Sequence, residues 1–300
     1  MKKLSLLGCI ALLIAGCKGC GDNPQQGTAR TTSEEYFKHT KTLNGVEQAK
    51  VPNLIKLFKD DMANPKPDVQ NFFISREMLS KIVALLEYEK NNTLPGKDST
   101  DGLRIYFAKS AKGAKASLLL VSTHTFKPTT AQQYKTHDDY YDHSSALADD
   151  LFKNVSDLSI PAYDDQRPGA RIYKPSNTIE PPCNTAGSHY ITRTVAEDMV
   201  ARFKGQPINT YAEWFDINFL SGLLKDPKCT GIRIYLGRHD EKHIKYPNQV
   251  AFVLIPTHLI NNVDEDNFDC DILKDFYKSD KSADKINPYD NGELCPTNCN

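Results

Sequence analysis

The amino-acid sequence predicts an α+β protein built from two related units, each with two helices followed by a β-hairpin. Three observations support this prediction. Two parts of the chain resemble each other, apolar residues at helical spacing precede each part, and each part contains two apolar runs of strand length around a polar turn. We expect the strands to form an antiparallel sheet with the helices packed against its apolar face.

The helices are predicted from apolar periodicity. The segment 215–224 aligns with 74–83, where residues three and four apart are typical of an amphipathic helix, and Ser75 can cap its start. Earlier helices are predicted over Pro52–Met62, which opens on a proline as a first helical turn allows, and over Val195–Phe203. The periodic apolar positions of the first repeat are Ile74, Met78, Leu79, Ile82, Val83 and Leu86.

The hairpins are predicted from two pairs of repeated runs. Each second run ends near a Thr-His pair, and we interpret His124 and His258 as hydrogen-bonded residues at strand ends. The runs are DGLRIYFAK and TGIRIYLGR, followed by SLLLVSTHTF and AFVLIPTHLI, at 101–109, 230–238, 117–126 and 251–260.

Alternation along the first strand separates its side chains into two faces. Arg104 and Tyr106 share one face in the first repeat, and Arg233 and Tyr235 share it in the second, opposite the apolar residues. An arginine beside a tyrosine can bind a carboxylate, which makes these four residues candidates for ligand binding. The alternative is a solvated sheet face on which the arginine stacks over the ring.

The N-terminus predicts export and lipidation. A basic start precedes an apolar stretch, Leu4–Gly16, that is too short to span a bilayer and is typical of a secretory signal. The sequence Leu13–Cys17 resembles the lipobox of bacterial lipoproteins, and this resemblance implies acyl chains on Cys17 and an anchor in the membrane. Because Lys18 rather than aspartate follows, we expect the outer membrane, on a face that the sequence leaves open.

These observations divide the chain. A short polar segment with little to bury follows the signal, and we interpret it as a flexible tether. A proline-rich stretch separates the repeats. The predicted parts are the signal peptide at 1–16, the tether at 17–33, the first unit at 34–154, the connector at 155–188 and the second unit with a cysteine-containing tail at 189–300.

The remaining cysteines suit an oxidising compartment. An even number in an exported chain favours disulfides, and the six that remain after processing allow 15 pairings, which stay open. Cys20 lies in the tether and is the one most easily left unpaired. The disulfide candidates in the body are Cys183, Cys229, Cys270, Cys295 and Cys299.

The strand motif and the tail carry a resemblance. The pattern C-x-G-[IL]-R-[IV]-Y at Cys229–Tyr235, with the Cys-Pro-rich tail Cys295–Cys299, resembles a group of secreted and lipid-anchored proteins of Bacteroidota. The match is looser over residues 72–124, where Thr100 replaces the cysteine. The resemblance implies a location and an architecture, and no activity.

Two clusters are candidates for a metal site. His137, Asp139 and His143 place nitrogen and oxygen ligands within seven residues, and His239 and His243 are four apart. The alternatives are an exposed connection for the first cluster and a solvated hairpin tip for the second. An acidic run beginning at Asp264 is interpreted as capping a helix from about Phe268.

Composition excludes one class of partner. The 37 basic and 38 acidic residues give a net charge of −1, which removes the general electrostatic basis for binding nucleic acid. The sequence has neither the G-x-S-x-G nucleophile motif nor a phosphate-binding glycine loop. We therefore expect a lipid-anchored, non-enzymatic binding module without a cofactor, whose partner is an envelope protein or a small ligand. The alternative is a hydrolase that uses a divalent metal at the histidine clusters.

Overall fold

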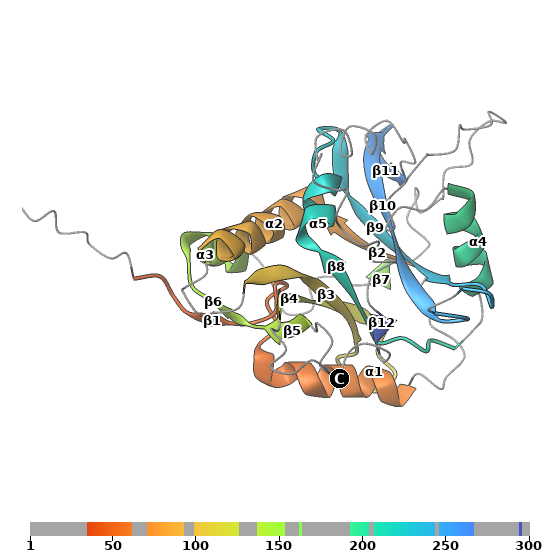
Figure 1. The fold of residues 1–300 in the computed structure, drawn as a ribbon, viewed down its shortest axis with the longest axis horizontal. Helices are drawn as coiled ribbons and strands as arrows, with labels where there is room; N and C mark the ends of the chain where they lie inside the picture. The colour runs from red at the N-terminus through yellow and green to blue at the C-terminus, as the bar shows by residue number, and fades with distance from the viewer. Residues whose placement is uncertain are drawn as a thin grey trace, which may run out of the picture. The chain divides into compact units, whose positions relative to one another are not determined.

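The protein is α+β, with two antiparallel five-stranded sheets in the unit Tyr36–Asn300 of the computed structural model (Figure 1). The structure describes residues 35–61, 71–92, 99–125, 137–153, 162–163, 193–203, 207–243, 246–266 and 294–295. The first sheet has the order β12 (Leu294–Cys295), β8 (Ala212–Asp216), β3 (Thr100–Ala108), β4 (Ser117–Thr125) and β5 (His137–Tyr140). The second has the order β11 (Val263–Asp266), β10 (Val250–Ile260), β9 (Cys229–Arg238), β2 (Asn71–Ser75) and β7 (Ala162–Tyr163).

Each sheet takes one strand from the other part of the chain. Strand β2 precedes β3 in sequence, yet it pairs with β9 in the second sheet. Strand β8 precedes β9, yet it pairs with β3 in the first sheet. The short strands β7 and β12 then pair with the outer sides of β2 and β8. The first sheet therefore cannot be completed without residues of the C-terminal half of the chain, nor the second without residues of the N-terminal half.

Helices α2 (Arg76–Asn91) and α5 (Ile217–Leu223) begin directly where these two strands end. The hydroxyl of Ser75 accepts a hydrogen bond from the backbone of Met78, and the carboxylate of Asp216 accepts one from Asn218. Ser75 therefore caps the first helix, as predicted. The chain turns from strand to helix without a loop, so each capping residue also belongs to a sheet.

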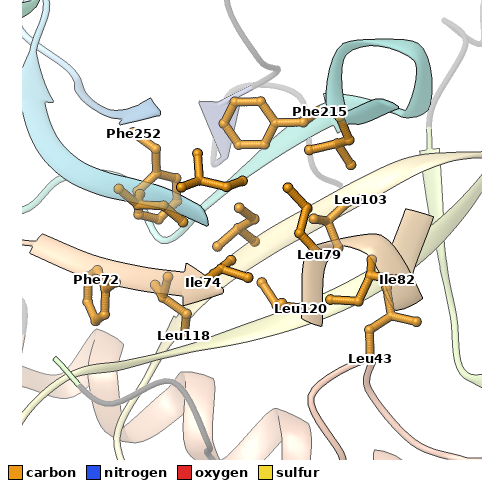
Figure 2. Close-up of a cluster of buried hydrophobic side chains, with 14 of the residues drawn as sticks. Leu43, Phe72, Ile74, Leu79, Ile82, Leu103, Leu118, Leu120, Phe215 and Phe252 are labelled. Atoms are coloured by element: carbon orange, nitrogen blue, oxygen red, sulfur yellow. The ribbon is translucent and has the colours of Figure 1, made fainter. Parts of the chain in front are cut away.

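The main core lies between the two sheets and includes α2 and α5 (Figure 2). The Phe107 ring of the first sheet packs 4.7 Å, centroid to centroid, from that of Phe252 in the second. The labelled residues of Figure 2 come from both sheets and from α2, together with Leu43 of the N-terminal segment. The core also includes Ala148 and Leu151 of the short helix α3 (Ala146–Phe152).

The outer face of each sheet is covered by one helix. Helix α1 (Val51–Asp61), preceded by a 3-10 turn η1 (Gln48–Lys50), packs on β3, and α4 (Arg193–Phe203) packs on β9 and β10 (Figure 1). Both helices were predicted to within two residues at each end. Small two-residue strands, β1 (His39–Thr40) and β6 (Asp142–His143), pair beside the first sheet.

The strands form two sheets, a point that the sequence left open. The structure corrects two details of the predicted fold. Each half has a strand between its two helices, because Asn71–Ser75 and Ala212–Asp216 are extended rather than helical. The segment from His137 is strand β5 and not an exposed connection.

Several predicted features lie outside the described residues. The signal peptide, the tether and nearly all of the connector belong to them, as does the helix predicted from Phe268. Of the predicted disulfide cysteines, Cys183, Cys270 and Cys299 lie there too, together with Cys17 and Cys20. In the part of the chain that is described, no helix is long and apolar enough to cross a bilayer.

Candidate functional site

The predicted arginine and tyrosine of β3 bind a carboxylate, and that carboxylate belongs to the protein. Arg104 donates from Nη1 to Asp139 Oδ1 and from Nη2 to the backbone oxygen of His137. The Tyr106 hydroxyl donates to Asp139 Oδ2 at 2.7 Å, and that of Tyr141 donates to the same atom at 3.2 Å. Strand β5 is thereby joined by its side chains to a strand that is not its neighbour in the sheet.

The same arrangement occurs in the second sheet. Arg233 donates from Nη1 to Asp266 Oδ1 and from Nη2 to the backbone oxygen of Asp264 at 2.6 Å. The Tyr235 hydroxyl donates to Asp266 Oδ2 at 2.6 Å. In both sheets the aspartate lies two residues after the carbonyl that accepts from the arginine. We call these two sets, Arg104–Tyr106–Asp139 and Arg233–Tyr235–Asp266, the Arg–Tyr–Asp clusters.

Both clusters are buried, which corrects the expectation of a solvated face. Arg104 is 6% exposed and Arg233 2%, because α1 and α4 cover these faces. Burial raises the pKa of Tyr106 and of Tyr235, and the adjacent aspartates raise it further. Burial also raises the pKa of Asp266. The carboxylate that the strand motif predicted as a ligand is therefore supplied internally, at the same position in each sheet.

Beside each cluster lies a second pair of side chains that joins the same two strands. The aspartate of this pair is on β3 in the first sheet and on β11 in the second. In the first sheet, Asp101 accepts from the hydroxyls of Thr123 (2.6 Å) and Thr125 (2.7 Å), and its Oδ2 lies 2.8 Å from His137 Nδ1. Burial alone raises the pKa of Asp101, but these hydrogen bonds and the charge of His137 outweigh it and the pKa is lowered. The His137 ring stacks on Trp214 with 3.7 Å between centroids.

In the second sheet the corresponding pair is Thr230 and Asp264. The Thr230 hydroxyl lies 2.6 Å from Asp264 Oδ1 and 3.0 Å from the hydroxyl of Thr257. A threonine thus stands where the first sheet has Asp101, and an aspartate stands where it has His137. The acidic residues Asp264 and Asp266 make these contacts within β11, and the helix that they were predicted to cap lies outside the described residues.

The first metal candidate is divided among different partners. His143 is fully buried and its Nδ1 lies 2.6 Å from Glu89 Oε1, whereas His137 is held by Asp101 and Asp139 by Arg104. Among the described residues, no group of three or more His, Cys, Asp or Glu side chains is placed to hold a metal ion. The residues therefore take part in three separate contacts.

The second metal candidate lies in the loop between β9 and β10, as predicted; the residues between its histidines are exposed, but His239 itself is buried. His239 is 5% exposed, its ring lies 4.1 Å from that of His243, and both rings are near the buried Tyr246. Burial, followed by the charge of His243, lowers the pKa of His239 to about 4. His243 Nδ1 accepts from the backbone of Tyr246 at 3.0 Å. The two histidine rings are tilted against each other at an interplanar angle of 30°.

The strand-end histidines are hydrogen-bonded, as the sequence predicted. His124 Nε2 lies 3.1 Å from the Thr100 hydroxyl, and His258 Nε2 contacts the carboxylate of Asp226. Cys229, a predicted disulfide partner, is a free and buried thiol in the structure. Its Sγ donates to the backbone oxygen of Gly231, and burial raises its pKa, so the expected disulfide at this position is corrected.

A buried acid that the sequence interpretation missed lies between the sheets. Glu213 of β8 is 2% exposed, and its Oε2 accepts a hydrogen bond from the backbone of Phe252 in β10 at 2.6 Å. Burial raises the pKa of Glu213 well above its ordinary value. Next to it, Asn209 Oδ1 accepts from the backbone of Val250 at 2.8 Å. These two side chains satisfy backbone donors on the side of β10 that faces away from β9.

The corresponding part of β4 is satisfied by an asparagine side chain and by the backbone of Leu43, which donates to the backbone oxygen of Leu120 at 2.6 Å. Asn44 donates from Nδ2 to the backbone oxygen of Leu118 and accepts at Oδ1 from the backbone of Leu120, both at 2.9 Å. The amide thus imitates a short paired strand. Neither Asn44 nor Glu213 lies in a recognisable motif. An acid between the apolar residues Ala212 and Trp214 is the only sequence signal that pointed to Glu213.

Comparisons with known proteins add no assignment, because no protein family, curated protein or solved structure matches the chain.

Proposed function

We propose that the protein is a lipid-anchored lipoprotein of the cell envelope, held in the outer membrane by acyl chains on Cys17. The observation that supports the anchor is the basic start, the short apolar run and the small residues directly before Cys17. Two or more acyl chains make such an anchor stable, since a single chain binds only marginally.

We propose further that the body consists of two copies of one unit that exchange a strand. The matching Arg–Tyr–Asp clusters support this proposal, as does the reciprocal pairing of β2 with β9 and of β8 with β3. The ends of the exchanged strands correspond in register. Phe72 pairs with Ala162 as Glu213 pairs with Leu294. This agreement in register supports the proposal beyond the similarity of the short motifs.

The body is proposed to act as a non-enzymatic binding module, with an envelope protein or a small ligand as its partner. The supporting observation is that the polar side chains of the strand motif bond to one another. A general base or nucleophile has to reach its substrate, and the buried Arg–Tyr–Asp clusters offer neither an accessible acid nor an activated hydroxyl. The clusters instead hold β5 and β11 in place.

The anchor is tested with Cys17→Ala. Membranes and soluble fractions of the source cells are separated, and the variant is expected in the soluble fraction while the parent chain sediments with the outer membrane. A Cys20→Ala variant is the matched control, because it removes a thiol three residues away without removing the predicted lipid attachment site. Equal membrane retention of the two variants would refute the proposal.

The alternative function is a metal-dependent hydrolase with ligands from His137, Asp139 and His143 or from His239 and His243. Elemental analysis of protein purified without a histidine tag distinguishes the two. A stoichiometric divalent metal that is lost in His143→Ala or His239→Ala would favour the hydrolase. Recovery of one envelope protein by crosslinking in intact cells, together with metal far below stoichiometric, is the result expected for the binding module.

A further inference from the structure

The end of the body that follows the predicted tether carries exposed apolar side chains. Tyr36 is 37% exposed and Phe37 77%, although large aromatic residues of a folded domain are usually mostly buried. Leu147 of α3 is 37% exposed and Tyr88 in the last turn of α2 is 41% exposed. We call these four residues the tether-end face. They make up four of the six exposed large hydrophobic residues in the described part of the chain.

Printed contacts bring the elements of this face together. His39 pairs with His143 in the small β1–β6 sheet, and its Nε2 lies 2.6 Å from Asp149 of α3. His143 in turn bonds to Glu89, the neighbour of Tyr88 in α2. In Figure 1, β1, β6, α3 and the end of α2 lie at the same end of the body. The backbone that carries Phe37 is therefore fixed against two helices.

Three lysines beside the face are already paired with acids. Lys38 lies 3.2 Å from Asp142, Lys41 lies 3.2 Å from Glu47, and Lys81 lies 3.2 Å from Asp150 of α3. This leaves no cluster of unpaired lysines of the kind that binds anionic lipid headgroups among the described residues of this end. A surface of aromatic and aliphatic residues with balanced charge suits the interface between headgroups and acyl chains.

We infer that the tether-end face lies against the lipid surface to which the protein is anchored. The inference rests on the proposed lipidation of Cys17, which places the covalent attachment 19 residues before Tyr36. An extended chain of that length spans at most about 65 Å, so the bilayer is always within reach. Because the body is attached at Tyr36, the residues around this point meet the membrane at the highest effective concentration.

The test replaces the natural anchor so that it does not depend on lipidation. Mature protein with a polyhistidine tag in place of Cys17 is attached to phosphatidylcholine vesicles that contain a nickel-chelating lipid. One variant carries Phe37→Trp and the matched control carries Leu259→Trp, because Leu259 is 58% exposed at the β10–β11 turn. Trp214, which is 7% exposed, is common to both variants. Bromine on the acyl chains then quenches any indole that reaches them.

The inference predicts a loss of at least about half of the added fluorescence for Phe37→Trp, and little loss for Leu259→Trp. Quenching that is unchanged by salt would agree with the paired charges. Equal quenching of the two variants, or none at position 37, would overturn the inference, whatever the result of the Cys17→Ala experiment. A concentration-dependent dimer that shields position 37 from an aqueous quencher would also overturn it, because a second copy would then cover the face.

Discussion

Ser75 caps helix α2 with its hydroxyl and pairs through its backbone with Gly231 of β9, so one residue joins a helix to a sheet completed by a distant part of the chain. Asp216 has the same two roles at α5 and Gly102. At each glycine a Cβ atom would fall well inside van der Waals contact with a backbone oxygen of the partner strand, that of Ile74 or that of Phe215.

These close approaches predict that Gly102→Ala and Gly231→Ala each destabilise the fold. Backbone atoms of a paired strand cannot move aside as a flexible side chain can, so we expect a loss of about 1–3 kcal/mol of unfolding free energy for each variant. Urea denaturation followed by circular dichroism measures the loss. Gly113→Ala is the contrast, because no atom lies within 4 Å of its Cβ position and only its positive φ opposes the change. An alanine at position 102 that is tolerated as well as one at 113 would contradict this interpretation of the exchanged strands.

The Arg–Tyr–Asp clusters predict that removing the arginine lowers the unfolding free energy much more than removing the tyrosine hydroxyl. Arg233→Met leaves Asp266 buried without its cation, which we expect to cost about 3–5 kcal/mol of unfolding free energy. Tyr235→Phe removes one hydrogen bond from an aspartate that keeps its arginine, and is expected to cost about 1–2 kcal/mol. The matching variants Arg104→Met and Tyr106→Phe should show the same order in the first sheet. Chemical denaturation of the four variants decides, and a neutral Arg233→Met would show that the cluster does not hold β11.

The helices and hairpins could be predicted because their apolar spacing is local. Strands β2 and β8 could not, since each has five residues and runs directly into a helix, so that Ile74 falls in phase with Met78 and appears helical. Alternation along the strand also predicted that Arg104 and Tyr106 lie on the same face. Their partner Asp139 did not, because a contact between residues 33 or more apart leaves no periodic signal in a single sequence. Burial by α1 depends on tertiary packing, which alternation alone does not reveal.

The buried Glu213 predicts that the unfolding free energy of the protein falls as the pH rises. Its pKa in the folded protein lies well above the ordinary value of 4.5, so the folded state binds this proton more tightly than the unfolded state. The stabilisation it gives is complete below the unfolded pKa and is lost as the pH rises through the folded pKa. Glu213→Gln keeps an acceptor for Phe252 without the charge, and should be about 1–3 kcal/mol more stable than the parent at pH 8 and nearly equal at pH 4. A difference that does not change between these two pH values in urea denaturation would contradict the assignment.

His239 predicts the opposite dependence of stability on pH, between pH 4 and 6.5. Its pKa falls from 6.5 to about 4 on folding, so the unfolded state binds the proton more tightly and stability is lost as the pH falls below 6.5. The full effect is on the order of 3 kcal/mol before solvent screening reduces it. In His239→Gln this contribution disappears, and the curve of unfolding free energy between pH 4 and 6.5 should become flatter. Thermal melts of both proteins across that range measure it, with Glu213→Gln as a control that leaves the histidine in place.

The Asp101–His137 pair of the first sheet corresponds to Thr230–Asp264 in the second. This difference predicts that the stability effects of substitutions at positions 101 and 137 are coupled. Asp101→Thr leaves His137 without its carboxylate, and His137→Asp places a second acid beside the first, so each change alone should destabilise the protein. Made together, they reproduce the Thr230–Asp264 pair, in which the hydroxyl can donate to the new carboxylate. A double-mutant cycle by urea denaturation should give a favourable coupling of about 1–2 kcal/mol. The stacking of His137 on Trp214 is lost in the double variant, so its stability should stay below that of the parent. Simple additivity of the two changes would mean that Asp101 and His137 do not act as one pair.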